Sequence, residues 1–178
     1  MSEAQPETLI RPAEPDDTPA IARIHVAGWR WAYRGQLPDA YLEGLSEGRR
    51  EAGWRETISS RADEHVWIAE QGQRIVGFAS AGPNRDADAV HGTGEVYAIY
   101  LDPEVVSTGV GRILFAHVVG DLRACGYRCA TLWVLETNIR TRRFYERADW
   151  RPDGSMKTEK IGEVELREVR YRTDFAAS

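Results

Sequence analysis

The sequence predicts a mixed α/β fold built on a mostly antiparallel sheet of about seven strands. Strand-like and helix-like runs follow the order β, helices, β, β, β, α, β, α, β, β. The strand–helix–strand unit at residues 94–134 requires one parallel strand pair within the sheet. No repeat or linker divides the 178 residues, so we expect a single domain over 1–178 with its core at about 8–175.

In the first half of the chain, a short strand is expected at residues 8–13. A helix then begins at Asp16 or Asp17 and carries an apolar stripe that includes Ile21 and Ile24. Residues 37–61 favour one or two short helices that break around Gly44 and Gly48.

The rest of the chain alternates strands and helices. Two β-rich runs at 66–69 and 74–81 surround a turn at Gln71-Gly72 and predict a hairpin. A strand at 94–103 precedes a helix from Gly109 to about Gly126, and the apolar run at 128–136 is typical of a strand buried on both faces. An arginine-rich helix capped by Thr137 or Asn138 and a hairpin at 150–158 and 163–175 complete the chain.

The composition narrows the classes of partner. A formal net charge of −5 argues against nucleic acid, and no run approaches the roughly 18 apolar residues of a membrane span. The N-terminal residues lack a basic start followed by an apolar run, so we expect a cytoplasmic protein. Cys125 and Cys129 have only His117 nearby as a further soft ligand; we therefore expect buried reduced thiols and no metal.

The segment "LDPEVVSTGVGRIL" at residues 101–114 places two glycines between a strand and a helix. The first amides of a helix lack intrahelical acceptors and carry the positive end of its dipole, so this turn can hold an anion. No Lys follows Gly111, which argues against an ATPase loop, and Leu114 stands where a dinucleotide fingerprint has its third glycine. Taken alone, the glycines could equally ease the start of a helix against a sheet.

Together, two segments resemble the GNAT superfamily of N-acetyltransferases. "YLDPEVVSTGVGRIL" is similar to that family's acyl-CoA-binding segment, and "LWVLETNIRTRRFYERADW" to its closing segment, with Asn138, Phe144 and Tyr145 matching. The sequence departs from the family pattern at four places. Val106 stands where Gln or Arg is usual, and Ser107 where Gly is often found. Thr141 replaces the usual Ala, and Asp149-Trp150 replaces Gly-Phe. If Asp149 keeps the conformation of the glycine it replaces, it needs an unusual backbone.

The resemblance implies helices on both faces of the sheet and a splayed parallel pair formed by the strands at 94–102 and 129–135. The pantetheine arm of acetyl-CoA would lie in the gap and pair with the main chain of 99–101, while the diphosphate sits on the amides of 107–112. The residues expected at the cofactor are Ile99, Tyr100, Leu101, Val106, Ser107, Thr108, Gly109, Val110, Gly111, Arg112, Asn138 and Tyr145.

The expected reaction is direct acetyl transfer to an amine. An alkylammonium with a pKa of about 10 must lose a proton first, and Glu95 is either the general base or an exposed carboxylate at a strand end. Tyr145 matches the family tyrosine that protonates the leaving thiolate; alternatively it is a core residue whose hydroxyl binds a backbone group. A main-chain amide near Tyr100 is the expected donor to the developing oxyanion.

The acceptor is less well defined. Trp29 and Tyr33 share a helix face in the region that overhangs the acceptor in similar GNAT proteins, and Tyr97 shares a face with Glu95 if its strand is regular. We expect a small-molecule primary amine; a protein or peptide Nα- or lysine acetyltransferase is the alternative, and a non-catalytic acyl-CoA sensor the second. The alternation in residues 164–175 suits strand exchange or edge pairing, through which we expect a homodimer.

Overall fold

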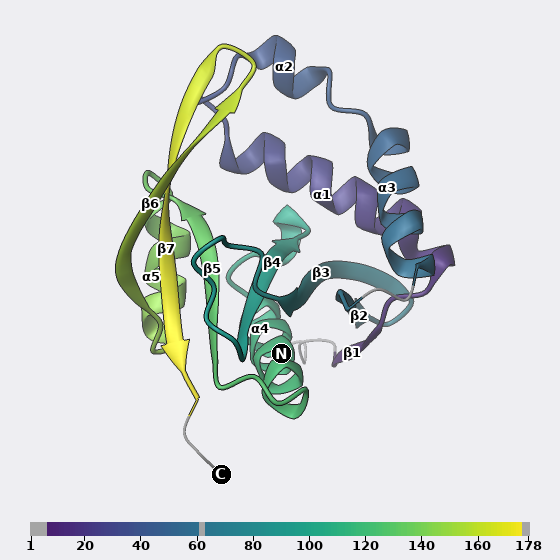
Figure 1. Cartoon of the computed structure of the whole chain (residues 1–178). Coiled ribbons are helices and arrows are strands. Elements are labelled where there is room, and N and C mark those ends of the chain that lie inside the picture. The colour runs from purple at the N-terminus through teal and green to yellow at the C-terminus, as the bar shows by residue number, and fades with distance from the viewer. Residues whose placement is uncertain (1–6, 61–62, 176–178) are drawn as a thin grey trace, which may run out of the picture.

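The computed structural model describes residues 7–60 and 63–175, and these form one seven-stranded sheet with the order β1-β2-β3-β4-β5-β7-β6 (Figure 1). The strands are β1 (Thr8–Pro12), β2 (His65–Gln71), β3 (Arg74–Pro83), β4 (Thr93–Leu101), β5 (Cys129–Leu135), β6 (Arg151–Ile161) and β7 (Val164–Asp174). Only β4 and β5 pair in parallel. The predicted mixed sheet is therefore confirmed; residues 1–6 and 176–178 of the predicted domain lie outside the described residues.

Helices cover both faces of this sheet (Figure 1). They are α1 (Thr18–Ala32), α2 (Asp39–Glu43), α3 (Glu47–Ser59), α4 (Val110–Ala124) and α5 (Ile139–Arg147), with short 3-10 turns at Pro15–Asp17 and Pro103–Val105. The break at Gly44 is confirmed, whereas Gly48 lies inside α3, because Ser46 caps that helix through the Arg49 amide. No helix among the described residues is long and apolar enough to span a bilayer.

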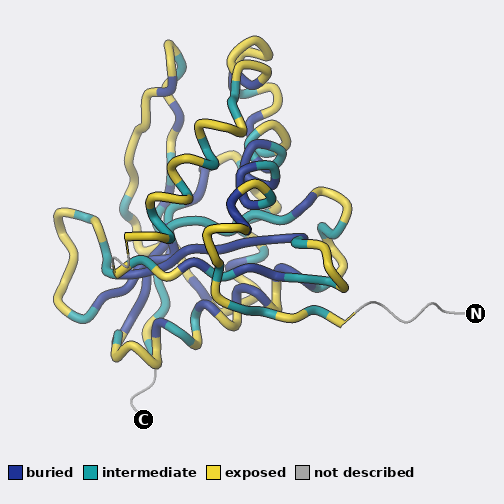
Figure 2. Tube along the Cα trace, turned by 90° about the vertical axis from the view of Figure 1, so that its right-hand side faces the viewer, coloured by how far each residue is buried: buried dark blue, intermediate teal, exposed yellow. Residues whose placement is uncertain are grey.

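Two apolar layers hold the helices to the sheet. On one face, Leu114, Val118 and Leu122 of α4 are essentially inaccessible and pack on the central strands. On the other face, Ile21 and Ile24 of α1 are fully buried against β2 and β3. Burial accordingly concentrates along the middle of the sheet (Figure 2).

Two predictions about the periphery were wrong. The segment Val164–Asp174 is not an edge strand, because β7 lies between β5 and β6; β1 and β6 are the edges. Cys125 is exposed rather than buried, since it follows the last residue of α4, whereas Cys129 is buried at the start of β5.

Candidate active site

The parallel pair β4–β5 is joined over only three residue pairs. The pairs are Thr93 with Cys129, Gly94 with Ala130 and Glu95 with Thr131, after which the two strands no longer pair. Beyond that point β4 stays bonded to β3 and β5 to β7, so the inner edges of both strands are left without a partner. A sheet opened in this way offers main-chain donors and acceptors to an extended ligand.

The pairing pattern decides which β4 groups face the gap. The Asp102 amide donates to the Val76 carbonyl at 2.8 Å, so Asp102, just after β4, stands at a hydrogen-bonded position opposite β3. Hydrogen-bonded and non-bonded pairs alternate in an antiparallel ladder, so the main chain of Tyr100 also faces β3. The main-chain groups of Ile99 and Leu101 therefore face the gap, and the amide of Tyr100 itself does not.

Ion pairs to the buried Asp102 anchor the loop after β4. Asp102 is 3 % exposed and accepts from Arg23 at 2.8 Å, from Arg74 at 2.7 Å and from the Glu104 amide at 3.2 Å. Burial opposes ionisation of Asp102, but these donors outweigh it and hold the pKa below its ordinary value. The sequence reasoning missed this anchor, because Arg23 and Arg74 come from distant segments.

The loop presents fewer free amides than the sequence suggested. The Thr108 amide donates to the Val105 carbonyl and the Arg112 amide to the Gly109 carbonyl, at 3.2 and 3.0 Å. Among the described residues, the amides in this loop without an intrachain acceptor are those of Ser107, Gly109, Val110 and Gly111. They stand at the N-terminus of α4, where backbone N–H groups attract an anion.

Two positions where glycine is usual in the family hold strained residues. Ser107 has φ 74° and Asp149 has φ 64°, and no other described non-glycine residue has a positive φ. The backbone conformation expected for Asp149 is thus confirmed, and Ser107 shares it. The Ser107 hydroxyl accepts from Arg140 at 2.6 Å, which brings a guanidinium beside the free amides.

Glu95 is a buried carboxylate, 8 % exposed, at the last paired position of β4. Its Oε2 accepts from the Arg85 amide at 2.8 Å. Burial raises its pKa above the ordinary value of 4.5, and the Arg85 amide opposes that rise only in part. The alternative of a solvent-exposed strand-end carboxylate is wrong.

Arg170 of β7 ties down the loop that carries Arg85. Its guanidinium donates to Asp86 at 2.9 Å, to Asp88 at 2.7 and 2.9 Å, and to Asp153 at 2.7 Å. Asp86 also accepts from the indole of Trp133 at 2.9 Å. Sequence reasoning did not find Arg170, because nothing local relates it to a loop 80 residues earlier in the chain.

Tyr145 projects from α5 into the core beside the gap and is 5 % exposed. Its ring contacts Phe115 at 5.3 Å, and its hydroxyl has no hydrogen-bond partner among the described residues. Burial, followed by the nearby Tyr100 hydroxyl, raises its pKa, so the phenol keeps its proton. Asn138 begins the same helix, and its Oδ1 accepts from the Thr141 amide at 3.1 Å, which confirms the predicted cap.

An aromatic cluster lies on the α1 face of β4. His25 stacks on Tyr100 with centroids 4.9 Å apart, and Trp29 stacks on Tyr33 at 4.6 Å. His25 accepts from Trp54 at 3.0 Å, and its pKa is lowered to about 4 by burial and by a nearby arginine, so it is neutral. Burial raises the pKa of Tyr100 to about 12, so this phenol is also neutral.

Tyr97 occupies an irregular point of β4. The register between β3 and β4 shifts at Ser80/Ala81, so the regular alternation assumed for Glu95 and Tyr97 does not hold. Both residues nevertheless meet Arg85: its guanidinium lies 3.4 Å from the Tyr97 ring centroid, and its amide binds Glu95. The Tyr97 hydroxyl donates to the Pro83 carbonyl at 2.5 Å.

The acetyltransferase (GNAT) family model matches residues 23–150, which contain the splayed pair, the amide loop and Tyr145. The chain belongs to the GNAT family. An uncharacterized N-acetyltransferase of Bacillus subtilis, YuaI, is 35% identical over 130 residues, covering 72% of each chain. This GNAT protein is an N-acetyltransferase by its family and relatives.

Solved structures share the fold at lower identity. PaiA N-acetyltransferase from Thermoplasma acidophilum, solved with coenzyme A, has a TM-score of 0.72 and 17% identity, with 95% of this chain and 99% of that one covered. A ribosomal-protein-alanine N-acetyltransferase from Brucella melitensis has a TM-score of 0.71 and 20% identity, covering 94% and 99%. Identities this low establish the fold and leave the acceptor of this GNAT chain open.

Proposed function

We propose that this chain transfers the acetyl group of acetyl-CoA directly to the primary amine of a small molecule. The observation that carries the proposal is the unpaired inner edge of β4. It leads from the buried carboxylate of Glu95, past the main chain of Ile99 and Leu101, to the free amides before α4. A carboxylate, an open strand edge and an anion site thus follow one another along a single strand and its loop.

In this proposal the main chain holds the cofactor. Ile99 and Leu101 pair with the pantetheine arm as a further strand would, and one of their amides donates to the developing oxyanion. The amides of Ser107 and 109–111 hold the diphosphate. Val106 contributes no free amide, because its N–H donates to the Pro103 carbonyl at 3.4 Å. Bound acetyl-CoA supplies an activated thioester, so the transfer itself needs no metal.

Glu95 takes the proton from the acceptor. An ammonium group cannot attack a thioester, because its nitrogen has no lone pair until the proton leaves. Burial raises the pKa of Glu95, which makes it a stronger base than an exposed glutamate. The Arg85 amide holds one carboxylate oxygen, so the other oxygen accepts the proton, directly or through a water.

Tyr145 supplies a proton to the leaving thiolate. Its raised pKa keeps the phenol protonated, and its hydroxyl has no competing partner among the described residues. The hydroxyl is also not one of the buried polar atoms left without a partner, which favours a hydroxyl open to a ligand over a core tyrosine bound to a backbone carbonyl.

A small acceptor is favoured by how the acceptor side of the molecule closes. Leu37 and Leu42, from the α1–α2 connection and α2, pack in one buried cluster with Ile161 and Leu166 at the tip of the β6–β7 hairpin. Figure 1 shows α2 beside that tip. An extended peptide needs an open groove between these two segments, whereas a small amine needs only an enclosed site.

The same cluster brings Tyr33 to this side, stacked on Trp29. The Trp29 indole nitrogen is buried beside the Tyr100 hydroxyl, whose pKa it lowers. Trp29 and Tyr33 thus form one wall, and Tyr97 lies beside Glu95 at the other side of the site.

Acetyl transfer to matched panels of small primary amines and of short peptides tests the proposal, with release of free coenzyme A and a product mass increase of one acetyl group as readouts. Transfer to small amines is the expected result. Transfer confined to peptides supports the Nα- or lysine acetyltransferase alternative. Acetyl-CoA binding without transfer to either panel supports the sensor.

Cytoplasmic location and a homodimer belong to the same proposal. Both cysteines are free thiols, as a reducing compartment requires. For pairing of two copies, the available C-terminal edge is β6 rather than β7.

A further inference from the structure

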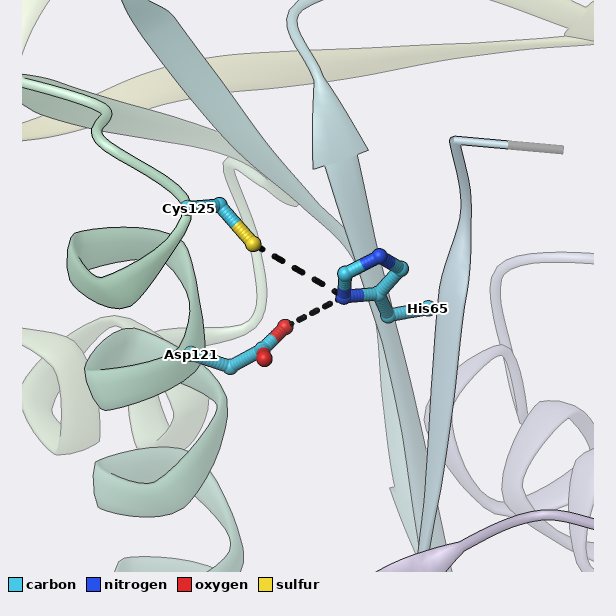
Figure 3. A group of neighbouring side chains, drawn as sticks. All are labelled: His65, Asp121 and Cys125. Carbon is cyan, nitrogen blue, oxygen red and sulfur yellow. Dashed lines mark hydrogen bonds and ion pairs between the residues drawn. The ribbon is translucent and has the colours of Figure 1, made fainter.

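Three side chains with different metal-ligating groups converge at the end of the sheet where β4 and β5 begin. Figure 3 shows His65, Asp121 and Cys125 pointing toward one another. The Nδ1 atom of His65 lies 2.7 Å from Asp121 Oδ2 and 4.0 Å from Cys125 Sγ. One ligand atom from each residue lies within 4.8 Å of the others, and no other such group occurs within residues 7–60 and 63–175.

The fold assembles this group from two separate elements. Asp121 and Cys125 are four residues apart at the end of α4, so they lie on one face of its last turn. His65 is the first residue of β2. The sequence analysis considered only His117, which instead packs edge-on against Trp67 at 4.4 Å.

The group lies away from the loop that would hold the diphosphate. The amide loop is at the N-terminus of α4 and the group at its C-terminus, about 22 Å away along a 15-residue helix. A role in holding the diphosphate is therefore excluded by distance.

A histidine–aspartate ion pair explains only part of this arrangement. One Nδ1–H can satisfy the Asp121 carboxylate, but the Cys125 sulfur approaches the same nitrogen and gains little from it at 4.0 Å. Three ligand atoms within 4.8 Å of one another are within reach of a single metal ion. We propose that His65, Asp121 and Cys125 bind a Zn²⁺ ion that clamps the start of β2 to the end of α4.

The distances are close to those of a tetrahedral site. Ligand atoms about 2.0–2.3 Å from one zinc ion are about 3.3–3.6 Å apart, so closure needs shifts of about an ångström. The side chain of His65 is 45% exposed, and Cys125 follows the end of a helix, so both can make such shifts. The thiol loses its proton to solvent as the Zn–S bond forms, so affinity rises with pH.

There is room for a fourth ligand. A cavity of about 220 Å³ is lined by His65 and Cys125 together with Asp63, Pro83 and Tyr127. This volume holds a water molecule with space to spare, and a water completes the coordination of a three-ligand zinc site. The cavity also explains how an ion enters from solvent.

The test is binding of Zn²⁺ or Co²⁺ alone to the reduced, chelator-treated full chain. We expect one ion per chain, a rise in melting temperature with Zn²⁺, and the sulfur-to-cobalt charge-transfer absorption of a thiolate ligand. Cys125→Ser and His65→Ala should each lose more affinity than the roughly 10–100-fold that removal of an outer-shell partner costs.

His117→Ala and Cys129→Ser are the matched controls, because they remove the same residue types outside the group. Both should bind the ion as the parent protein does. The proposal is overturned if the parent binds no ion at micromolar concentration, if Cys125→Ser binds as tightly as the parent, or if the Co²⁺ complex shows no thiolate band. None of these readouts involves acetyl transfer, so they are independent of the proposed function.

Discussion

The two ends of the β4–β5 pair differ in the groups that they present. Where the strands begin, side chains do the work: Arg170 joins the β3–β4 loop to the C-terminal hairpin, and Arg85 in that loop fixes Glu95. Where the strands diverge, unpaired main-chain groups face the gap and the loop. In the proposed function, main-chain groups therefore hold the cofactor at the open end, and side chains carry out proton transfer at the closed end.

Tyr145→Phe should have the largest effect on turnover. Removal of the proton donor should lower kcat by about 10²–10⁴-fold, the usual contribution of general acid catalysis. The affinity for acetyl-CoA should stay within about twofold, because the ring and the main-chain contacts remain. Steady-state kinetics and calorimetry measure the two quantities, with Tyr41→Phe on the exposed face of α2 as the control. Parental turnover by the variant removes Tyr145 from the mechanism.

Glu95→Gln tests the closed end of the strand pair. In the parent, kcat/KM should rise as the pH increases through the raised pKa of Glu95, and the variant should lose about 10²-fold together with this acid limb. The free energy of unfolding of the parent should instead fall as the pH rises. A carboxylate whose folded pKa lies above its unfolded value stabilises the fold only when protonated, so the charge costs stability as the pH rises.

The Glu95→Gln variant should not lose this stability. The free energy of unfolding of the variant minus that of the parent should therefore increase from acidic to neutral pH, which urea denaturation at both pH values measures. A variant that keeps the parental pH profile of kcat/KM shows that another group is the base.

Arg170→Met tests the side-chain network behind Glu95. Its loss leaves Asp86 and Asp153, both about 16% exposed, without their main cation, which should cost about 3 kcal/mol of unfolding free energy. Arg172→Met is the matched control on the same strand, because its ion pair with the exposed Asp174 is worth at most about 1 kcal/mol. Equal losses in the two variants would contradict the buried network.

Gly109→Ala and Ser107→Gly test the loop before α4 by opposite changes, since one adds a Cβ at a positive φ and the other removes one. Gly109 has φ 100°, so a Cβ there should cost about 1–2 kcal/mol and weaken acetyl-CoA binding. Ser107 already has φ 74°, so glycine should change the stability by less than about 1 kcal/mol. Thermal unfolding and acetyl-CoA titration of both variants check the pair; a Gly109→Ala variant with parental affinity contradicts an amide site at this loop.

Much of the fold could be predicted from local pattern. The order of helices and strands along the chain, the cap at Asn138 and the break at Gly44 depend on residues within a few positions of each other. The position of β7 between β5 and β6, and the register shift near Tyr97, depend on pairing between distant strands. Local sequence carries no record of that pairing.

By itself, the sequence determined a mixed sheet, a helix entered through glycines, and the residue types that acetyl transfer needs. Only the tertiary structure decided that Glu95 is buried and that His65 lies beside Cys125. It also decided that the amides of Thr108 and Arg112 donate to nearby carbonyl groups and are not free for a ligand. The physical reason is that helix and strand propensities act over a few residues. Burial, pKa and ligand geometry instead depend on groups that folding brings together from up to 84 positions away, as Arg170 and Asp86 show.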